Sequence, residues 1–376
     1  MNFLNPQALG GSFAIQTSHP IDWLFVAGAF ILLAAGALVL RYFGAGSIER
    51  GAERLTGVPA WASLPNLTAT WALLVAFIGF VWDVAWHADT GRDRELFTVP
   101  HVLILVGLMG IAASALVAIW SATRNNQQVG WQVGRFHVPF ASVPLLVIGG
   151  GALLGFPLDD LWHGAYGIDV TMWSPTHLLM IGGASLSPIA LWLLLAEGGA
   201  ARTPQGRQMW AGMAGVVLVG LSTFQLEFDM GIPQWQAFYH PLLVAAAGGI
   251  ALVAARTALG RGGALRAALS FLVLRIFMAL LVGGFLGRSL PHFPLYLGSA
   301  VCVEAAFLVL GRRALILKAV VAGVLVSTVG LLIESAWIAV FFQYPWHASL
   351  LPFAWMFVAI GVASAVIGAA MGSIVG

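Results

Sequence analysis

The sequence predicts an all-α protein that crosses a membrane about eleven times, as one helix followed by five helical hairpins with internal repeats. The chain of 376 residues is 60% hydrophobic and only 9% charged, whereas soluble domains carry about 25% charged residues. Its mean hydropathy is +0.92, and apolar runs near the ~20 residues that a bilayer requires recur throughout. We therefore treat residues 1–376 as one integral membrane domain in contact with lipid.

Apolar runs separated by clusters of Gly, Pro and Arg predict the order of the spans. They lie at residues 22–43, 66–87, 100–122, 139–162, 176–197, 208–228, 240–258, 265–287, 293–311, 316–341 and 348–373. The hairpins at 66–122 and 139–197 are duplicates that carry the metal sites described below. The three further hairpins, within 208–373, are more diverged relatives.

The basic residues predict the orientation. Most of the 17 Lys and Arg residues fall in loops on one side of the predicted spans. The positive-inside rule places that side in the cytoplasm, with the N-terminus outside and the C-terminus inside. We expect a bacterial inner membrane protein whose hairpin turns lie on the outer face. The N-terminal segment has no basic stretch followed by an apolar core, so we expect no cleavable signal peptide.

The most specific feature of the chain is a polar motif that occurs twice without a gap. Residues 83–101 read DVAWHADTGRDRELFTVPH, and residues 159–177 read DDLWHGAYGIDVTMWSPTH. The shared residues are Asp83/Asp159, Trp86/Trp162, His87/His163, Gly91/Gly167, Asp93/Asp169 and His101/His177. Solvated side chains and helix caps could explain one copy. Two copies that match at all these positions indicate two metal sites that arose by duplication.

Each copy provides one carboxylate and two imidazoles in positions where they can meet. Asp83 and His87 are one helical turn apart, so they share a helix face. His101 follows a proline in the first turn of the returning helix, and neighbouring helices pack about 8–10 Å apart. The corresponding residues of the second copy are Asp159, His163 and His177. The sequence therefore predicts two Asp-His-His sites, each with positions left for water or substrate.

Two imidazoles and a carboxylate suit copper, zinc, iron or manganese, and the absence of a thiolate disfavours a soft Cu(I)–sulfur site. Asp93 and Asp169 are candidates for orienting a ligand imidazole or for capping the returning helix. Trp86 and Trp162 are interpreted as anchors at the bilayer boundary. The histidine spacing also resembles that of a cytochrome b with two haems. That arrangement needs each pair on a continuous helix, which the intervening glycine, charges and proline disfavour.

The later hairpins contain weaker candidates for metal binding, which are Glu227, His240, His292, Glu334 and His347. For the three histidines, a buried and hydrogen-bonded side chain at a helix start is an equally good interpretation. Arg275 and Glu304 lie within predicted spans at a similar distance from the turn near Leu290. Because charges inside a membrane are normally paired or functional, we expect a pair that locks two helices, in preference to a proton or charge relay.

The duplicated motif resembles the copper-binding motif in the C subunit of particulate methane and ammonia monooxygenases. That subunit carries two such triads on neighbouring membrane helices, and the matching residues here are Asp83, His87, His101, Asp159, His163 and His177. This chain departs from that family in having more predicted spans and in beginning both copies with Asp. The resemblance implies copper and oxidative chemistry on a small apolar substrate.

These observations favour a copper-dependent, monooxygenase-like oxidoreductase over two alternatives. The first alternative is a multi-pass transporter or metal-handling permease, with Arg275 and Glu304 on its path. Against it, both metal sites are predicted at the membrane boundary rather than the midplane, and no pair of interrupted helices is evident. The second is a structural subunit that associates with other membrane subunits. The sequence has no basic patch interleaved with aromatic residues, so we expect no nucleic-acid partner. Cys302 is the single cysteine, so no intramolecular disulfide can form.

Overall fold

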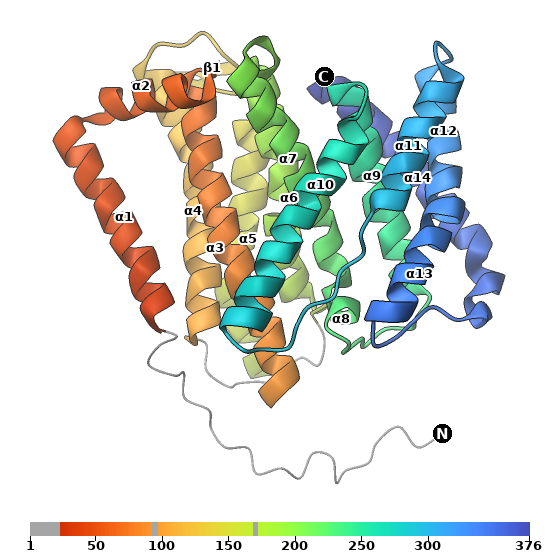
Figure 1. Cartoon of the computed structure of the whole chain (residues 1–376). Helices are drawn as coiled ribbons and strands as arrows, with labels where there is room; N and C mark the ends of the chain where they lie inside the picture. Colours follow the sequence, from red (N-terminus) through yellow and green to blue (C-terminus); the bar gives the residue numbers. More distant parts are fainter. Residues whose placement is uncertain (1–22, 92–96, 168–171) are drawn as a thin grey trace.

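A computed structural model shows the protein as a bundle of long helices (Figure 1). The structure describes residues 23–91, 97–167 and 172–376. Within these ranges, nine helices are long and apolar enough to cross a membrane. The predicted all-α, polytopic membrane fold is therefore confirmed, whereas the predicted count of about eleven spans is not.

The first half of the chain holds the two hairpins that carry the duplicated motif. Its elements are α1 (Trp23–Phe43), α2 (Ala45–Thr56), α3 (Ala60–Thr90), α4 (Val99–Arg124), β1 (Trp131–Val133), β2 (Phe136–Val138), α5 (Ser142–Tyr166) and α6 (Pro175–Glu197). The two strands pair antiparallel, with Gln132 opposite His137. Helix α2 lies across one end of the bundle (Figure 1). Its buried Glu49 accepts hydrogen bonds from Ser121 and Asn125, which fasten α2 to the end of α4.

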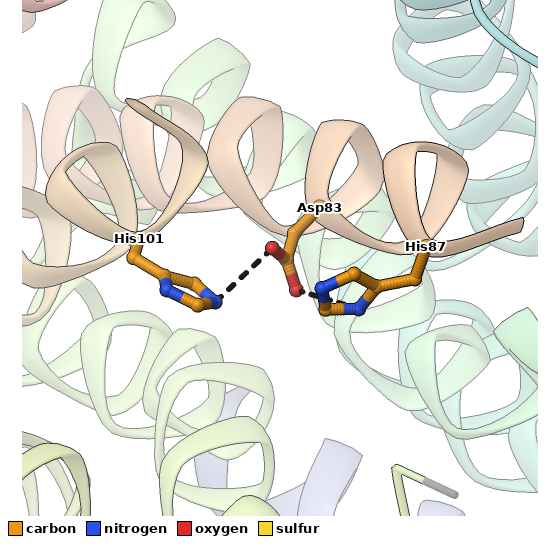
Figure 2. A group of neighbouring side chains, drawn as sticks. All are labelled: Asp83, His87 and His101. Carbon is orange, nitrogen blue, oxygen red and sulfur yellow. Dashed lines mark ion pairs between the residues drawn. The ribbon is translucent and has the colours of Figure 1, made fainter. Parts of the chain in front are cut away.

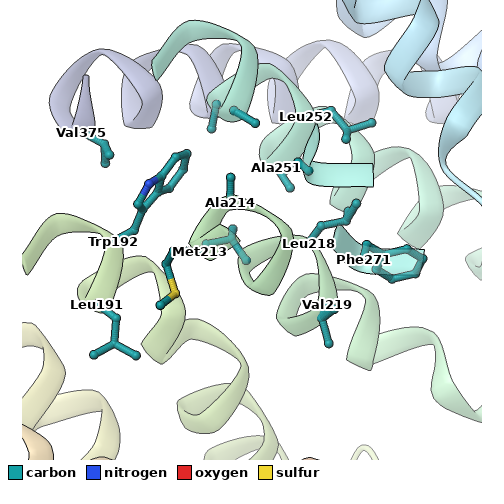
Figure 3. Close-up of a cluster of buried hydrophobic side chains, with 14 of the residues drawn as sticks. Leu191, Trp192, Met213, Ala214, Leu218, Val219, Ala251, Leu252, Phe271 and Val375 are labelled. Carbon is teal, nitrogen blue, oxygen red and sulfur yellow. The ribbon is translucent and has the colours of Figure 1, made fainter. Parts of the chain in front are cut away.

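The second half packs around α9, which contacts α7, α10 and each of α11 to α14. Its elements are η2 (Ala200–Arg202), α7 (Pro204–Ser222), η3 (Thr223–Gln225), α8 (Leu226–Asp229), α9 (Tyr239–Leu259), α10 (Gly263–Met278), the π-helical η4 (Ala279–Phe285), α11 (Leu297–Leu310), α12 (Leu315–Leu325), the π-helical η5 (Val326–Gly330), α13 (Leu331–Phe341), η6 (Ala348–Phe353) and α14 (Ala354–Val375). Of the nine candidate spans, the one that contains α7 is the most buried, at 67%. Figure 3 shows Met213 and Leu218 of α7 among side chains of neighbouring helices, including Trp192, Leu252 and Phe271.

Helix α11 is the clearest departure from the predicted spans. Residues 293–311 were expected to cross the membrane, but the helix begins only at Leu297 and contains 14 residues. Its length of about 21 Å is less than the ~30 Å of a hydrocarbon layer. The preceding residues 286–296 are not helical. They run from one end of the bundle to the start of α11, which lies part-way along the bundle (Figure 1). The predicted span is therefore interrupted: a non-helical segment is followed by the half-helix α11.

Glycines allow the helices of the two motif hairpins to approach closely. A Cβ atom added at Gly107 of α4 would lie 2.5 Å from the Cβ of an alanine on α3, and one added at Gly79 of α3 would lie 2.7 Å from the carbonyl oxygen of Pro100. Gly155 and Gly183, each 76 residues later, make the equivalent contacts between α5 and α6. The metal motifs are offset by the same 76 residues, so the duplication includes the helix packing that positions each motif.

Replacing Gly107 by Ala should destabilise the first hairpin, because the added methyl group has no room against α3. We expect a loss of about 1–3 kcal/mol in the free energy of unfolding, measured by denaturation of the purified protein in detergent. Gly150→Ala on α5 is the matched control, since a Cβ there meets nothing within 4 Å. Equal stability of the two variants would contradict the close approach of α3 and α4.

Candidate metal centre

The end of α3 and the start of α4 bring Asp83, His87 and His101 together, with the carboxylate between the two imidazoles (Figure 2). Nε2 of His101 lies 3.1 Å from Oδ1 of Asp83, and Nδ1 of His87 lies 3.7 Å from Oδ2. The two rings stand at 69° with centroids 6.3 Å apart. One potential ligand atom from each residue lies within 4.8 Å of the other two, so all three could reach a single ion.

The end of α5 and the start of α6 build a second group from Asp159, His163 and His177. Nε2 of His177 lies 3.2 Å from Oδ2 of Asp159, and Nε2 of His163 lies 3.8 Å from the same oxygen. The rings stand at 82° with centroids 5.7 Å apart. Again, one ligand atom from each residue lies within 4.8 Å of the others. The two copies of the motif therefore form two separate triads of the same composition.

The same local signals end and restart the helix in both hairpins. Helices α3 and α5 are closed by Gly91 and Gly167, whose φ angles of 84° and 89° favour glycine. Their N–H groups donate to the carbonyl oxygens of His87 and His163, at 3.1 and 2.9 Å. Helices α4 and α6 each begin with a proline in the first turn, where its missing N–H is not needed. The motif thus encodes the turn as well as the ligands.

The second triad has an additional hydrogen bond. Thr176 donates from Oγ1 to Oδ1 of Asp159 at 2.5 Å. In the first copy the corresponding residue is Pro100, whose side chain has no donor. Asp159 is therefore held by a third group beside its two histidines, and its orientation is more constrained than that of Asp83.

Both triads line one cavity of about 490 Å³. Apart from the six triad residues, its walls are mainly apolar and include Phe77, Phe80, Leu108, Phe156, Met180 and Val216. The lining runs along α3 from His87 to Thr70, about 25 Å at the rise of an α-helix. The two triads are therefore two parts of one chamber.

Glu227 is a cavity residue whose role is to hold loops in place. Its carboxylate oxygens accept hydrogen bonds from the N–H of Met172, at 2.8 Å, and of Gln234, at 3.1 Å. Met172 lies just before the start of α6, and Gln234 lies between α8 and α9. Glu227 thereby links the approach to the second triad with the next hairpin.

None of the weaker candidates joins a metal-ligating group within the described ranges of the chain. These residues are Glu227, His240, His292, Glu334 and His347. Glu334, like Glu227, directs both oxygens to backbone N–H groups, those of Leu295 and Tyr296. His240 is buried, stacks on Phe228 and accepts a hydrogen bond at Nδ1 from the indole of Trp346. The interpretation of a buried, hydrogen-bonded histidine therefore holds for His240. His292 is half-buried with its ring against Phe342, and His347 is exposed.

Two further predictions concern residues of the motif. Trp86 was interpreted as an anchor at the bilayer boundary, but it is 3% exposed and packs inside the bundle beneath the guanidinium of Arg288. Trp162 is half-buried and contacts Tyr166. The candidates for orienting a ligand, Asp93 and Asp169, lie outside the described residues.

The expected pair between Arg275 and Glu304 is wrong. Arg275 pairs with Asp229, whereas Glu304 pairs with Arg256, at 2.8 Å, and caps the start of α10 by accepting from the N–H of Gly262. The prediction assumed two continuous helices around a central turn. Because residues 286–296 are not helical, α11 starts late and carries Glu304 to the opposite end of α10.

Replacing Thr176 by Val should weaken metal binding at the second triad only, because Asp159 loses the donor that orients it. Loss of such an outer hydrogen bond costs about 10- to 100-fold in metal affinity. Competitive metal titration of variants that retain one triad would measure this effect. Thr176→Ser, which keeps the hydroxyl, should bind as the wild-type residue does. Equal weakening in Val and Ser variants would exclude a role for this hydrogen bond.

Comparison with known proteins adds no family to these observations. No protein-family model, curated protein or solved structure matches this chain. The resemblance to the monooxygenase C subunit is confined to the duplicated motif, so the function must be inferred from the geometry of the two triads and their cavity.

Proposed function

We propose that the protein is a membrane metalloenzyme that binds one transition-metal ion at each triad, copper being the expected metal, and oxidises a small apolar substrate. A single observation carries this proposal. Both Asp-His-His groups open into the same mainly apolar cavity. Ligand side chains around a cavity are typical of a catalytic metal site, whereas structural metals are usually enclosed by protein ligands.

The donor set supports a redox-active metal with open coordination positions. Imidazole nitrogens bind copper, zinc and iron well, and two histidines with one carboxylate leave positions for further ligands. A bound metal would supply redox or Lewis-acid chemistry at the end of the cavity. Iron shares this donor set with copper, and elemental analysis distinguishes them. Zinc would support hydrolytic chemistry in place of oxidation.

The protein's own residues supply charge, orientation and an environment with little water. Each aspartate contributes one negative charge against a divalent cation, which reduces the cost of holding the ion in an apolar region. Asp83 and Asp159 lie beside both imidazoles of their triads. The aromatic and aliphatic walls exclude water, and a cavity of about 490 Å³ falls within the size range of small-molecule sites.

The cavity's apolar lining and its course along α3 favour a hydrophobic substrate that partitions into lipid. The triads lie at the end of the bundle opposite α2 (Figure 1). If the basic loops are cytoplasmic, as the positive-inside rule predicts, both triads face the outer side of a bacterial inner membrane. An electron donor on that side, or a further membrane subunit, would complete an oxidase cycle.

A transporter or metal-handling permease is the second candidate, and one observation favours it. Helix α11 is interrupted and begins beside buried charges, an arrangement typical of transporter sites. The triads, in contrast, lie at helix ends. Retention of metal at fixed stoichiometry during purification would favour the enzyme, whereas metal-dependent transport into vesicles would favour the permease.

Elemental mass spectrometry of the purified protein tests the metal sites. The wild-type protein should hold one metal ion in each of its two triads, and His87→Ala/His163→Ala should lose nearly all of it. Each single variant should lose about half, since two imidazoles and a carboxylate at the other triad remain. Copper would justify measuring oxygen consumption with small apolar substrates.

The matched control is His347→Ala, because His347 is exposed and belongs to neither triad. Its metal content should equal that of the wild-type protein. An unchanged metal content in the double variant would sink the proposal, as would a wild-type protein that contains no metal after purification without chelators.

A further inference from the structure

A second polar centre surrounds the start of the half-helix α11. Asp229 at the end of α8, Arg275 of α10 and Glu334 of α13 converge there and are all at most 2% exposed. Arg275 donates from Nη2 to Oδ2 of Asp229 and, at 3.1 Å, to the carbonyl oxygen of His292. Tyr296, fully buried, interacts electrostatically with all three charged residues. Asp229, Arg275 and Glu334 are called the charged cluster below.

The backbone of this region is irregular. Residues 286–296 are not helical, and such backbone at membrane depth is tolerated only where protein buries it or where it lines a cavity. Tyr296 has a φ of 59°, a left-handed conformation that is strained for a bulky residue. Strained conformations of this kind persist mainly at functional sites. The irregular backbone before α11 therefore indicates a functional site.

The charged cluster contains one negative charge in excess when both carboxyl groups are ionised. The two oxygens of Glu334 accept from the N–H groups of Leu295 and Tyr296, at the positive end of the α11 dipole, and both contacts favour its ionised form. Arg275 is always protonated. Asp229 is thus the group whose charge can change, and neutralising it would leave the buried cluster with no net charge.

The atom that would accept a proton is also identifiable. In the described part of the chain, Oδ1 of Asp229 has no hydrogen-bond partner, although the residue is 0% exposed. Nη1 of Arg275 and Nε2 of Gln225 likewise have none there. Gln225 accepts a hydrogen bond at Oε1 from the hydroxyl of Tyr296, at 3.2 Å, so it belongs to the same region. Buried polar atoms of this kind require an explanation such as an ion, a proton or water.

The charged cluster lies between two openings. On one side, an open pocket of about 410 Å³ is lined by residues that include Met230, Ser289 and His292. On the other side, Thr223 and Glu227 face the metal cavity. Along the short turns η3 and α8, Thr223 and Glu227 therefore line the metal cavity. Asp229 belongs to the charged cluster, and Gln225 is hydrogen-bonded to Tyr296 beside it. This single segment separates the two polar regions.

We propose that the charged cluster is a proton-binding centre, in which Oδ1 of Asp229 takes up a proton that enters from the pocket beside His292. The step converts a carboxylate and a proton into a carboxylic acid, and no other bond changes. Intramembrane acids that act as proton relays are typical of pumps, transporters and redox proteins that move protons. The centre could serve either candidate function, and it requires no metal.

In the described part of the chain, the charged and titratable groups around Asp229 come from several elements. Arg275 approaches from α10, Glu334 from α13, and Tyr296 from the turn before α11. His292 contacts the same site through its backbone, since its N–H donates to the carbonyl oxygen of Asp229 at 2.9 Å. On the segment of Asp229 itself, Glu227 faces the metal cavity. From α9, His240 is enclosed by Phe228, Phe342 and Trp346.

Infrared difference spectroscopy of the purified full-length protein tests the centre. At neutral pH we expect the carbonyl band of a protonated carboxylic acid, shifted in D₂O and lost at alkaline pH. The band should be absent in Asp229→Asn and present in Glu334→Gln. Glu304→Gln is the matched control, because it removes another paired carboxylate, one that caps the start of α10, and should leave the band unchanged.

Stability provides a second readout. Asp229→Asn imitates the protonated state, so it should fold with the thermal stability of the wild-type protein and keep its full metal content. Arg275→Gln adds to the negative excess and should unfold at a much lower temperature. A wild-type protein that contains no metal but shows the band would contradict the metal-site proposal and leave the proton-binding centre intact. The two proposals can therefore fail independently.

Three outcomes would overturn the proton-binding centre. One is persistence of the band in Asp229→Asn, and another is its loss in Glu334→Gln only. The third is a wild-type protein without the band whose thermal stability rises with Na⁺ at constant ionic strength and no longer does so in Asp229→Asn. That result would assign the site to a monovalent cation.

Discussion

A charge inside a membrane protein must find its counter-charge and hydrogen-bond partners within the protein, because the hydrocarbon layer offers neither. This constraint explains where the few ionisable residues of the chain lie. Glu49 fastens α2 to α4, Glu304 caps the start of α10, and Glu334 caps the start of α11. These three carboxylates thus join helix ends and irregular turns, while the buried core consists mainly of alanine, aliphatic and aromatic residues.

The duplicated hairpins show how the same constraint builds a site. Two histidines lie beside each aspartate of the triads. The close contacts at Gly79 and Gly155 bring the return helices near enough for this arrangement. A metal ion would satisfy the same donor atoms more completely. The proposed chemistry therefore follows from a geometry that the packing of small residues makes available.

The metal cavity and the charged cluster lie on opposite sides of a single segment, residues 223–229. Thr223 and Glu227 of that segment line the cavity, whereas Gln225 and Asp229 lie in the polar region around Arg275. An oxidase that consumes protons and a permease that exchanges protons for metal would both benefit from such proximity. In the non-helical residues 286–296, backbone groups bond to side chains: the carbonyl oxygen of His292 accepts from Arg275, and the N–H of Leu295 donates to Glu334. In the interior of a continuous helix such groups would bond within the helix.

The sequence by itself determined the all-α membrane fold and the two triads. Apolar runs of bilayer length dictate spanning helices, and the spacing of Asp83, His87 and His101 places their side chains on facing helix ends. The 76-residue offset of the close-contact glycines is also present in the sequence, but small residues are so common in membrane helices that their role needed the contacts. Only the tertiary structure decided that both triads share a cavity, that Trp86 is buried, and that Arg275 pairs with Asp229. Those relations depend on which helices are neighbours and on where α11 begins, and hydropathy does not distinguish a full span from a non-helical segment followed by a half-helix.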